Sequence, residues 1–266
     1  MCEEENTRMS EPTHERPIET IKEAAQQAAK VETASPPVRR YRTVLFKVAI
    51  SFAVVVFALL TFLVKTTPSF PIDLQITQAI QSIASPFFAG FMRLISWPGF
   101  LPQSIIITLL IAFVLYQSGL HWESVACLLA SIFSGLINQL AKNLIQRPRP
   151  SVDIVDVFAI LESYSFPSGH VMFYTILFGF VWYLAYTLLK PSLPRSLLLG
   201  VFGSFILLVG VSRIYLGQHW ASDVLGAYLL GGLVLAGIVF LHQWGKTRFF
   251  VRQPVAPPDS KGDDHV

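Results

Sequence analysis

Long runs without Asp, Glu, Lys or Arg divide the middle of the chain into apolar segments. A membrane-spanning helix needs about 20 consecutive, mostly apolar residues, and most of these runs reach or approach that length. The runs cover residues 48–64, 94–122, 124–141, 163–189, 196–212 and 224–245. They predict six spanning helices, at about residues 46–64, 101–117, 122–141, 171–189, 196–214 and 223–244.

Residues 74–92 are also free of charged side chains, but their pattern is not that of a span. Pro86 interrupts the segment, and several polar side chains lie among the apolar ones. They include Gln75, Thr77, Gln78, Gln81 and Ser82. A mixed pattern of this kind favours an amphipathic segment that lies at the membrane surface.

Composition favours a membrane protein over a soluble one. Of the 266 residues, 53% are hydrophobic and 14% are charged, whereas a typical soluble domain carries about 25% charged residues. Residues 48–244 hold only 14 of the 37 charged residues, too few to cover the surface of a soluble core of that size. We therefore predict an all-α integral membrane protein, a bundle of six transmembrane helices over residues 44–244. A polar, largely disordered tail over 1–43 precedes it, and a short cytoplasmic tail over 245–266 follows.

Charge and cysteine content exclude two other classes. The formal net charge of +3 comes from scattered basic residues beside apolar spans, so the chain lacks the basic surface of a nucleic-acid-binding protein. Cys2 and Cys127 are the two cysteines, and they can build neither a disulfide framework nor a cysteine metal site. The expected partners are the bilayer and a membrane lipid, and the oligomeric state is left open.

Basic residues near the helix ends predict the orientation, because cytoplasmic loops carry an excess of Lys and Arg. With six spans, three basic groups fall on one side: Arg39, Arg40, Arg42 and Lys47, then Lys190 and Arg195, then Lys246, Arg248 and Arg252. Both termini are therefore expected to be cytoplasmic, in the plasma (inner) membrane. The opposite face also carries basic residues, which indicates that some of them have a function there.

Three polar segments border that opposite, extracytoplasmic face. They are KNLIQRPRP at residues 142–150, FPSGH at 166–170 and SRIYLGQHWASD at 212–223. In a six-helix arrangement all three lie at the same membrane boundary, so they can converge although about 70–80 residues separate the first from the last. Ionisable residues at such a depth are costly and indicate a functional site.

Each segment contributes a group suited to phosphate chemistry. Lys142, Arg149 and Arg213 are cations that can bind phosphate oxygens. Ser168 and Gly169 directly precede a helix, whose N-terminus favours anions.

Two histidines and a carboxylate complete this set. His219 and Asp223 are four residues apart, so a helical turn places them on one face, where the carboxylate can fix the imidazole tautomer. His170 supplies a second imidazole. These are the parts that phosphoryl transfer needs: a nucleophile, an acid, an orienting group and a clamp of positive charge.

The three segments resemble the signature of the type 2 phosphatidic acid phosphatase (PAP2) superfamily, K-x6-RP, PSGH and SR-x5-H-x3-D. The matching residues are Lys142 with Arg149-Pro150, Pro167 to His170, and Ser212-Arg213 with His219 and Asp223. They match without departure, and the resemblance covers about residues 44–244.

This resemblance implies a role for each residue. His219 would be the nucleophile that forms a phosphohistidine, Asp223 its orienting partner, and His170 the acid for the leaving group. Lys142, Arg149, Ser168, Gly169 and Arg213 would bind the phosphate and stabilise the transition state. The family works without a metal, so no cofactor is expected.

Arg147 is open to two interpretations, a fourth phosphate ligand or an interfacial anchor. Asp153 and Asp156 are interpreted as a solvated acidic surface rather than a metal pair. The resulting function is hydrolysis of a lipid phosphate or diphosphate at the extracytoplasmic face: undecaprenyl diphosphate, phosphatidylglycerol phosphate or phosphatidate. The alternatives are a lipid phosphotransferase and a vanadate-binding, haloperoxidase-like protein.

Overall fold

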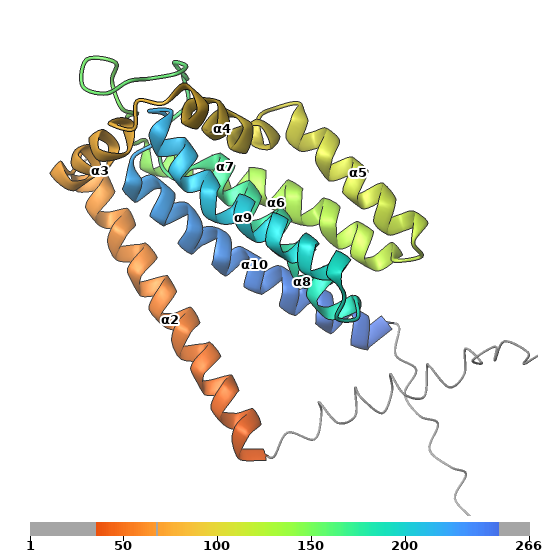
Figure 1. Cartoon of the computed structure of the whole chain (residues 1–266). Coiled ribbons are helices and arrows are strands. Elements are labelled where there is room, and N and C mark those ends of the chain that lie inside the picture. The colour runs from red at the N-terminus through yellow and green to blue at the C-terminus, as the bar shows by residue number, and fades with distance from the viewer. Residues whose placement is uncertain (1–35, 68, 250–266) are drawn as a thin grey trace, which may run out of the picture. The chain divides into compact units, whose positions relative to one another are not determined.

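The computed structural model describes residues 36–67 and 69–249, and this part of the chain is helical, with connecting turns and loops and no strand (Figure 1). The elements are α2 (Pro36–Thr66), α3 (Pro71–Gln81), α4 (Pro86–Ser96), η1 (Trp97–Gly99), α5 (Gln103–Gln117), α6 (His121–Ile145), α7 (Gly169–Phe173), η2 (Tyr174–Phe178), α8 (Gly179–Leu188), α9 (Leu193–Tyr215) and α10 (Ala221–Phe249). The predicted all-α membrane fold is confirmed. Residues 1–35 and 250–266 lie outside the described residues, so the limits of the two tails remain predictions.

Packing divides the chain after Ser51 into two units. Of the first unit, the structure describes residues 36–51, which form the N-terminal part of α2. The second unit begins at Phe52 and contains the rest of α2 and all the other helices. It also carries every residue of the candidate site.

The helices reproduce the predicted spans within a few residues. Five are long and apolar enough to cross a membrane: Thr43–Thr66, His121–Ile145, Gly169–Leu188, Leu193–Tyr215 and Ala221–Arg248. Helix α5 has only 15 residues. It completes a sixth span when Pro86–Gly99 and Gln103–Gln117, which are bent by 62° relative to each other, count as one.

The predicted surface segment over 74–92 consists of two helices, α3 and α4. Helix α3 ends at Gln81, and α4 starts at Pro86 behind Ser85, whose hydroxyl accepts a hydrogen bond from the Phe88 backbone nitrogen at 3.4 Å. Proline is favoured in the first helical turn, where its missing N–H costs nothing. Pro86 therefore begins a helix rather than only interrupting one, and α4 leads through η1 towards α5.

The continuous helical run α7–η2–α8 forms the centre of the second unit. Its core side chains are fully buried among α6, α9 and α10, and they include Met172, Tyr174, Ile176, Leu177 and Phe180. The outer faces of the surrounding helices are apolar and exposed, as at Phe113, Leu136 and Leu207. An apolar outer surface around an apolar core suits a bilayer, where packing and hydrogen bonds rather than solvent exclusion hold helices together.

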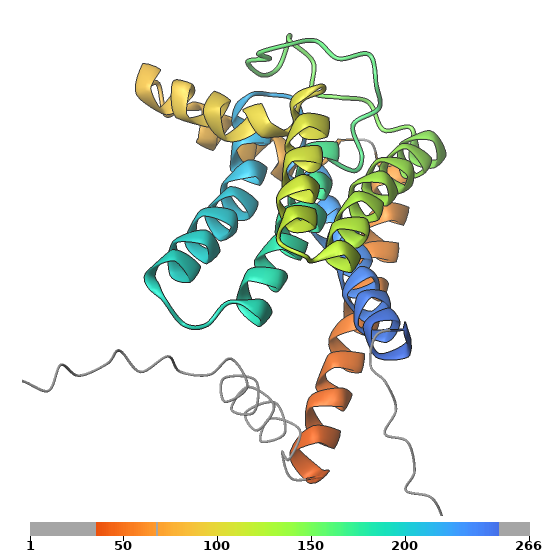
Figure 2. The same cartoon turned by 90° about the vertical axis from the view of Figure 1, so that its right-hand side faces the viewer.

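Hydroxyl groups fasten α5 to α6. The Ser124 hydroxyl donates to the Ala112 carbonyl at 2.7 Å, and the Thr108 and Ser131 hydroxyls lie 3.1 Å apart. The loops that bear the predicted site residues gather at one end of this unit, together with α3 and α4 (Figure 2).

Candidate active site

The three motif segments converge at the end of the second unit where α6 and α9 finish and α7 and α10 begin. Lys142 lies in the last turn of α6 and Arg213 in the last turn of α9. Gln146 follows α6 with a left-handed backbone (φ 57°), which turns the chain towards Arg149. The backbone nitrogen of Ser168, just before α7, donates to the Asp223 carbonyl at 3.3 Å and so joins the second segment to the third.

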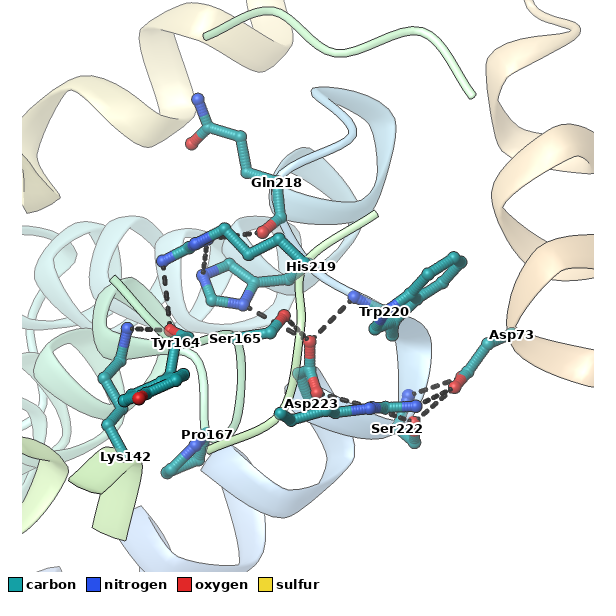
Figure 3. A network of polar contacts seen from close by, with 12 residues as sticks. Asp73, Lys142, Tyr164, Ser165, Pro167, Gln218, His219, Trp220, Ser222 and Asp223 are labelled. Atoms are coloured by element: carbon teal, nitrogen blue, oxygen red, sulfur yellow. Dashed lines mark hydrogen bonds and ion pairs between the residues drawn. The ribbon is translucent and has the colours of Figure 1, made fainter. Parts of the chain in front are cut away.

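His219 and Asp223 form the pair that their spacing predicts. His219 Nδ1 lies 3.5 Å from Asp223 Oδ2, and both side chains are buried. Asp223 Oδ2 also accepts hydrogen bonds from the Ser165 hydroxyl and, at 2.9 Å, from the Trp220 backbone nitrogen. The carboxylate is thus held from several sides and lies beside one edge of the imidazole, whose Nδ1 has no hydrogen-bond partner among the described residues (Figure 3).

The other nitrogen of His219 faces a cation. Arg149 Nη1 lies 3.3 Å from His219 Nε2. Because a guanidinium can only donate, this geometry assigns the lone pair to Nε2 and the proton to Nδ1, beside the carboxylate. That tautomer is the one in which Nε2 can attack phosphorus.

Several buried polar atoms near His219 have no hydrogen-bond partner among the residues that the structure describes. They are Ser168 Oγ, His170 Nε2, Arg213 Nε and Arg213 Nη2. Arg213 is fully buried, with only Nη1 bonded, to the Ser96 hydroxyl at 3.2 Å. Unpaired buried groups are costly, and a cluster of them calls for a functional explanation. Here they are donors suited to the oxygens of a phosphate.

Lys142 and Arg149 both bond to the stretch before α7. Lys142 Nζ donates to the Tyr164 carbonyl at 2.6 Å, and Arg149 Nε donates to the Ser163 carbonyl at 2.6 Å. Arg149 Nη1 also donates to the Gln218 carbonyl at 2.5 Å. These carbonyl oxygens position the two cations beside His219.

The second imidazole, His170, packs against η1 and the residue after it. The Phe100 ring meets the His170 ring edge to face, with centroids 4.6 Å apart. A Cβ added at Gly99 would overlap the His170 ring and lie 3.0 Å from Tyr174. Glycine at position 99 therefore makes room for His170, a requirement that the motifs do not reveal.

Arg147 is neither of the two things that the sequence suggested. It is 1% exposed, so it is not an interfacial anchor, and both terminal nitrogens of its guanidinium bond to carboxylates, which does not suit a phosphate ligand. It makes ion pairs with Asp223 at 2.5 Å and with Asp73 of α3 at 2.7 Å. Sequence reasoning missed Asp73 altogether, and its only signal was a lone acidic residue at the edge of an otherwise uncharged segment.

Asn138 is a second residue that sequence reasoning missed. From α6, one turn before Lys142, its amide donates to the Pro167 carbonyl at 3.1 Å. Asp153 and Asp156 are exposed, as predicted. Among the described residues, no group of three or more His, Cys, Asp or Glu side chains is arranged to hold a metal ion.

Comparison with known proteins agrees with this geometry. The sequence profile of the PAP2 superfamily matches residues 123–248, a range that contains all eight predicted site residues. Residues 123–248 of this chain thus match the PAP2 superfamily. The resemblance predicted from the three motifs is therefore confirmed.

Two PAP2 relatives are similar in sequence over the motif region. Phosphatidylglycerophosphatase B of Bacillus subtilis (strain 168) is 36% identical over 120 residues, 42% of this chain and 55% of that protein. Undecaprenyl-diphosphatase of Sulfolobus acidocaldarius is 29% identical over 114 residues, 41% of this chain and 50% of that protein. The chain thus spans about half the length of these relatives.

A solved structure extends the likeness to most of the fold. The crystal structure of a transmembrane PAP2-type phosphatidylglycerolphosphate phosphatase from Bacillus subtilis superimposes with a TM-score of 0.66 at 26% identity. The superposition covers 75% of this chain and 98% of that one.

Burial holds the pKa of His219 well below the usual histidine range, because an imidazolium cannot be hydrated there. The nearby charges of Arg149, Arg213 and Lys142 lower the pKa of His219 further. The imidazole is therefore neutral at neutral pH, as a nucleophile requires.

This shift predicts a pH-dependent contribution to stability. Since the pKa of His219 is lower in the folded chain than the unfolded value of about 6.5, the contribution is present above that pH and is lost as the pH falls towards the folded pKa. Between about pH 7.5 and about pH 5.5, the Tm in detergent should fall more for the wild type than for His219→Gln, which does not titrate. Equal falls for both proteins would contradict the shift.

Proposed function

We propose that the chain is a membrane phosphatase that removes phosphate from a lipid phosphate or diphosphate through a phosphohistidine on His219. One observation carries the proposal: His219 Nε2 faces Arg149 while Nδ1 faces the buried carboxylate of Asp223. A neutral, oriented imidazole beside buried cations suits in-line attack on an anionic phosphorus centre. The names of the relatives suggest phosphatidylglycerol phosphate and undecaprenyl diphosphate as substrates, and phosphatidate is a third candidate.

The reaction proceeds in two transfers. In the first, His219 Nε2 forms a bond to phosphorus, and the bond from phosphorus to the leaving oxygen breaks. His170, which takes up a proton when the anionic phosphate binds beside it, gives that proton to the leaving oxygen. In the second, water attacks phosphorus, His170 takes the water proton, and the P–N bond breaks. The products are the lipid alcohol or, from a diphosphate, the lipid monophosphate, together with inorganic phosphate and the enzyme in its initial state.

The phosphoryl oxygens would bind Lys142, Arg149, Arg213, the Ser168 hydroxyl and the backbone N–H at Gly169. Donors fixed before the reaction stabilise the transition state without reorganising. Arg213 is well suited to this role, because its Nε and Nη2 form the edge that can bind two oxygens at once. The charge of the transferring group is thus balanced by the chain's own cations, without a metal.

A cavity of about 550 Å³ beside the site supports a lipid substrate. Helices α5 and α6 line most of it, with side chains such as Leu109 and Leu136, and Gly169 and Phe173 line the end next to the motif. An apolar groove that reaches the first residue of α7 can hold a hydrocarbon chain while the headgroup lies among the cations.

The leaving group should separate the roles of the two histidines. Replacing His219 by Ala removes the nucleophile, so kcat/KM should collapse on every substrate. His170→Ala should cost about 10²–10⁴-fold on phosphatidate, whose alkoxide needs a proton, and far less on p-nitrophenyl phosphate. Phosphate release is measured in detergent with EDTA present, and the activity should persist there.

Equal losses for both variants on every leaving group would contradict the assignment of His170 as the acid. A lipid phosphate product without phosphate release would instead indicate the phosphotransferase alternative.

The groove predicts a selective effect of Gly135→Leu. Gly135 lines the cavity and a Cβ there meets nothing within 4 Å, so leucine fills the groove without straining the helix. It should raise KM for a long-chain lipid phosphate about tenfold, as if about two methylenes at about 0.8 kcal/mol each were displaced, and leave p-nitrophenyl phosphate hydrolysis unchanged.

Gly200→Leu is the matched control, because Gly200 lies in a helix with equally open space around it but outside the cavity. Equal effects of both variants on the long-chain substrate would remove the groove from the proposal.

We further propose that the site faces away from the cytoplasm and that both termini are cytoplasmic. Ile160, 81% exposed in the loop before α7, is a suitable reporter. With Cys2 and Cys127 changed to Ser, Ile160→Cys should react with an impermeant thiol reagent in intact cells or spheroplasts, whereas Lys190→Cys should react only after lysis. The reverse pattern would invert the topology.

A further inference from the structure

Asp73 of α3 is buried, 1% exposed, and uses both carboxylate oxygens. Its Oδ1 accepts from the Ser222 backbone nitrogen at 2.8 Å, and its Oδ2 accepts from the Ser222 hydroxyl at 2.5 Å and from Arg147 Nη2 at 2.7 Å. These bonds hold α3 to the first turn of α10, next to Asp223.

Arg147 links Asp73 to Asp223. Its Nη1 donates to Asp223 Oδ1 at 2.5 Å and to the Ser222 hydroxyl at 2.7 Å. Asp73, Arg147, Asp223 and His219 therefore form a continuous buried chain of contacts, which Figure 3 shows running from Asp73 towards His219.

The charges along this chain explain why a second carboxylate is present. When Nε2 of His219 accepts a phosphoryl group while Nδ1 keeps its proton, the ring becomes cationic, and Asp223 stabilises it. Arg147 alone would neutralise Asp223 and weaken that effect. Asp73 pairs with the same guanidinium, so Arg147 offsets less of the negative charge of Asp223. Asp223 can then stabilise the positive charge of the His219 ring more strongly.

We propose that Asp73 is a positioning residue for the reaction: through Arg147 and Ser222 it fixes Asp223 against His219 and balances the charge of Arg147. This inference rests on the proposed phosphatase function and adds a residue outside the three motifs.

The test compares Asp73→Asn with the wild type on a long-chain lipid phosphate in detergent. Asparagine keeps the shape but loses the charge, and its amide N–H opposes the donors of Arg147 and Ser222. We expect kcat to fall about 10–100-fold, the range that small displacements of reacting groups produce. KM should stay within about twofold, because Lys142, Arg149 and Arg213 are untouched.

The pH profile separates this role from a merely structural one. The charged and titratable groups facing His219 are Asp223 of α10, Arg149 after α6, Lys142 of α6, Arg213 of α9 and His170 of α7. Removing the negative charge of Asp73 makes these surroundings more positive and disfavours the imidazolium. The acid limb of kcat/KM should therefore move to lower pH in Asp73→Asn, with the ionisation of the substrate common to both enzymes.

Asp153→Asn is the matched control, since Asp153 is exposed in the loop before α7, and it should behave as the wild type. A wild-type kcat and pH profile per folded molecule of Asp73→Asn would overturn the inference, as would a raised KM with unchanged kcat. If Asp73→Asn does not fold, Ser222→Ala decides: a reduced kcat at constant KM supports the inference, and wild-type kinetics overturn it. A wild type that releases no phosphate from any lipid phosphate would overturn the proposed function itself.

Discussion

Asp223 binds two separate stretches of chain to the start of α10 with a single carboxylate. Its Oδ1 pairs with Arg147, which follows α6, and its Oδ2 accepts from Ser165, which precedes α7, and from its own turn at Trp220. Arg147 in turn reaches Asp73 on α3. Removing one partner of a buried ion pair lowers the free energy of unfolding by about 3–5 kcal/mol. The loops around the site therefore cannot move apart independently, and His219 is held against a rigid frame.

The centre of the second unit and the end that carries the candidate site are held by different kinds of interaction. Around α7, η2 and α8 the helices pack through apolar side chains, supplemented by hydroxyl bonds such as that of Ser124. In a bilayer such packing is not driven by release of water from the outer faces, so it sets positions without strong directional preference. The relative orientation of the loops is set around the candidate site, where each ion pair and hydrogen bond selects one arrangement of the loops.

The sequence predicted the helices because charged residues are nearly absent from them. A helix that crosses a bilayer excludes most charged residues, so the charge-free runs mark the spans. It also predicted eight candidate site residues, because the motif spacings carry chemistry that membrane anchoring does not need. It did not predict what holds these residues. Arg147 lies within a motif, but its partners come from positions 74 and 76 residues away, and no local pattern encodes such pairings. The role of Gly99 depends on the ring of His170, another contact between distant segments.

Lys142 and Arg149 are positioned by the carbonyl oxygens of Ser163, Tyr164 and Gln218. Every residue type supplies a carbonyl, so these carbonyl bonds do not depend on which side chains stand at the three positions, although the Ser163 hydroxyl also accepts from Arg149 Nη2 at 2.9 Å. Insertions or deletions are different, because one residue more or less would shift the carbonyls out of reach. Selection should therefore constrain the length of the stretch before α7 more tightly than its composition, a constraint that comparison of residue identities alone would overlook.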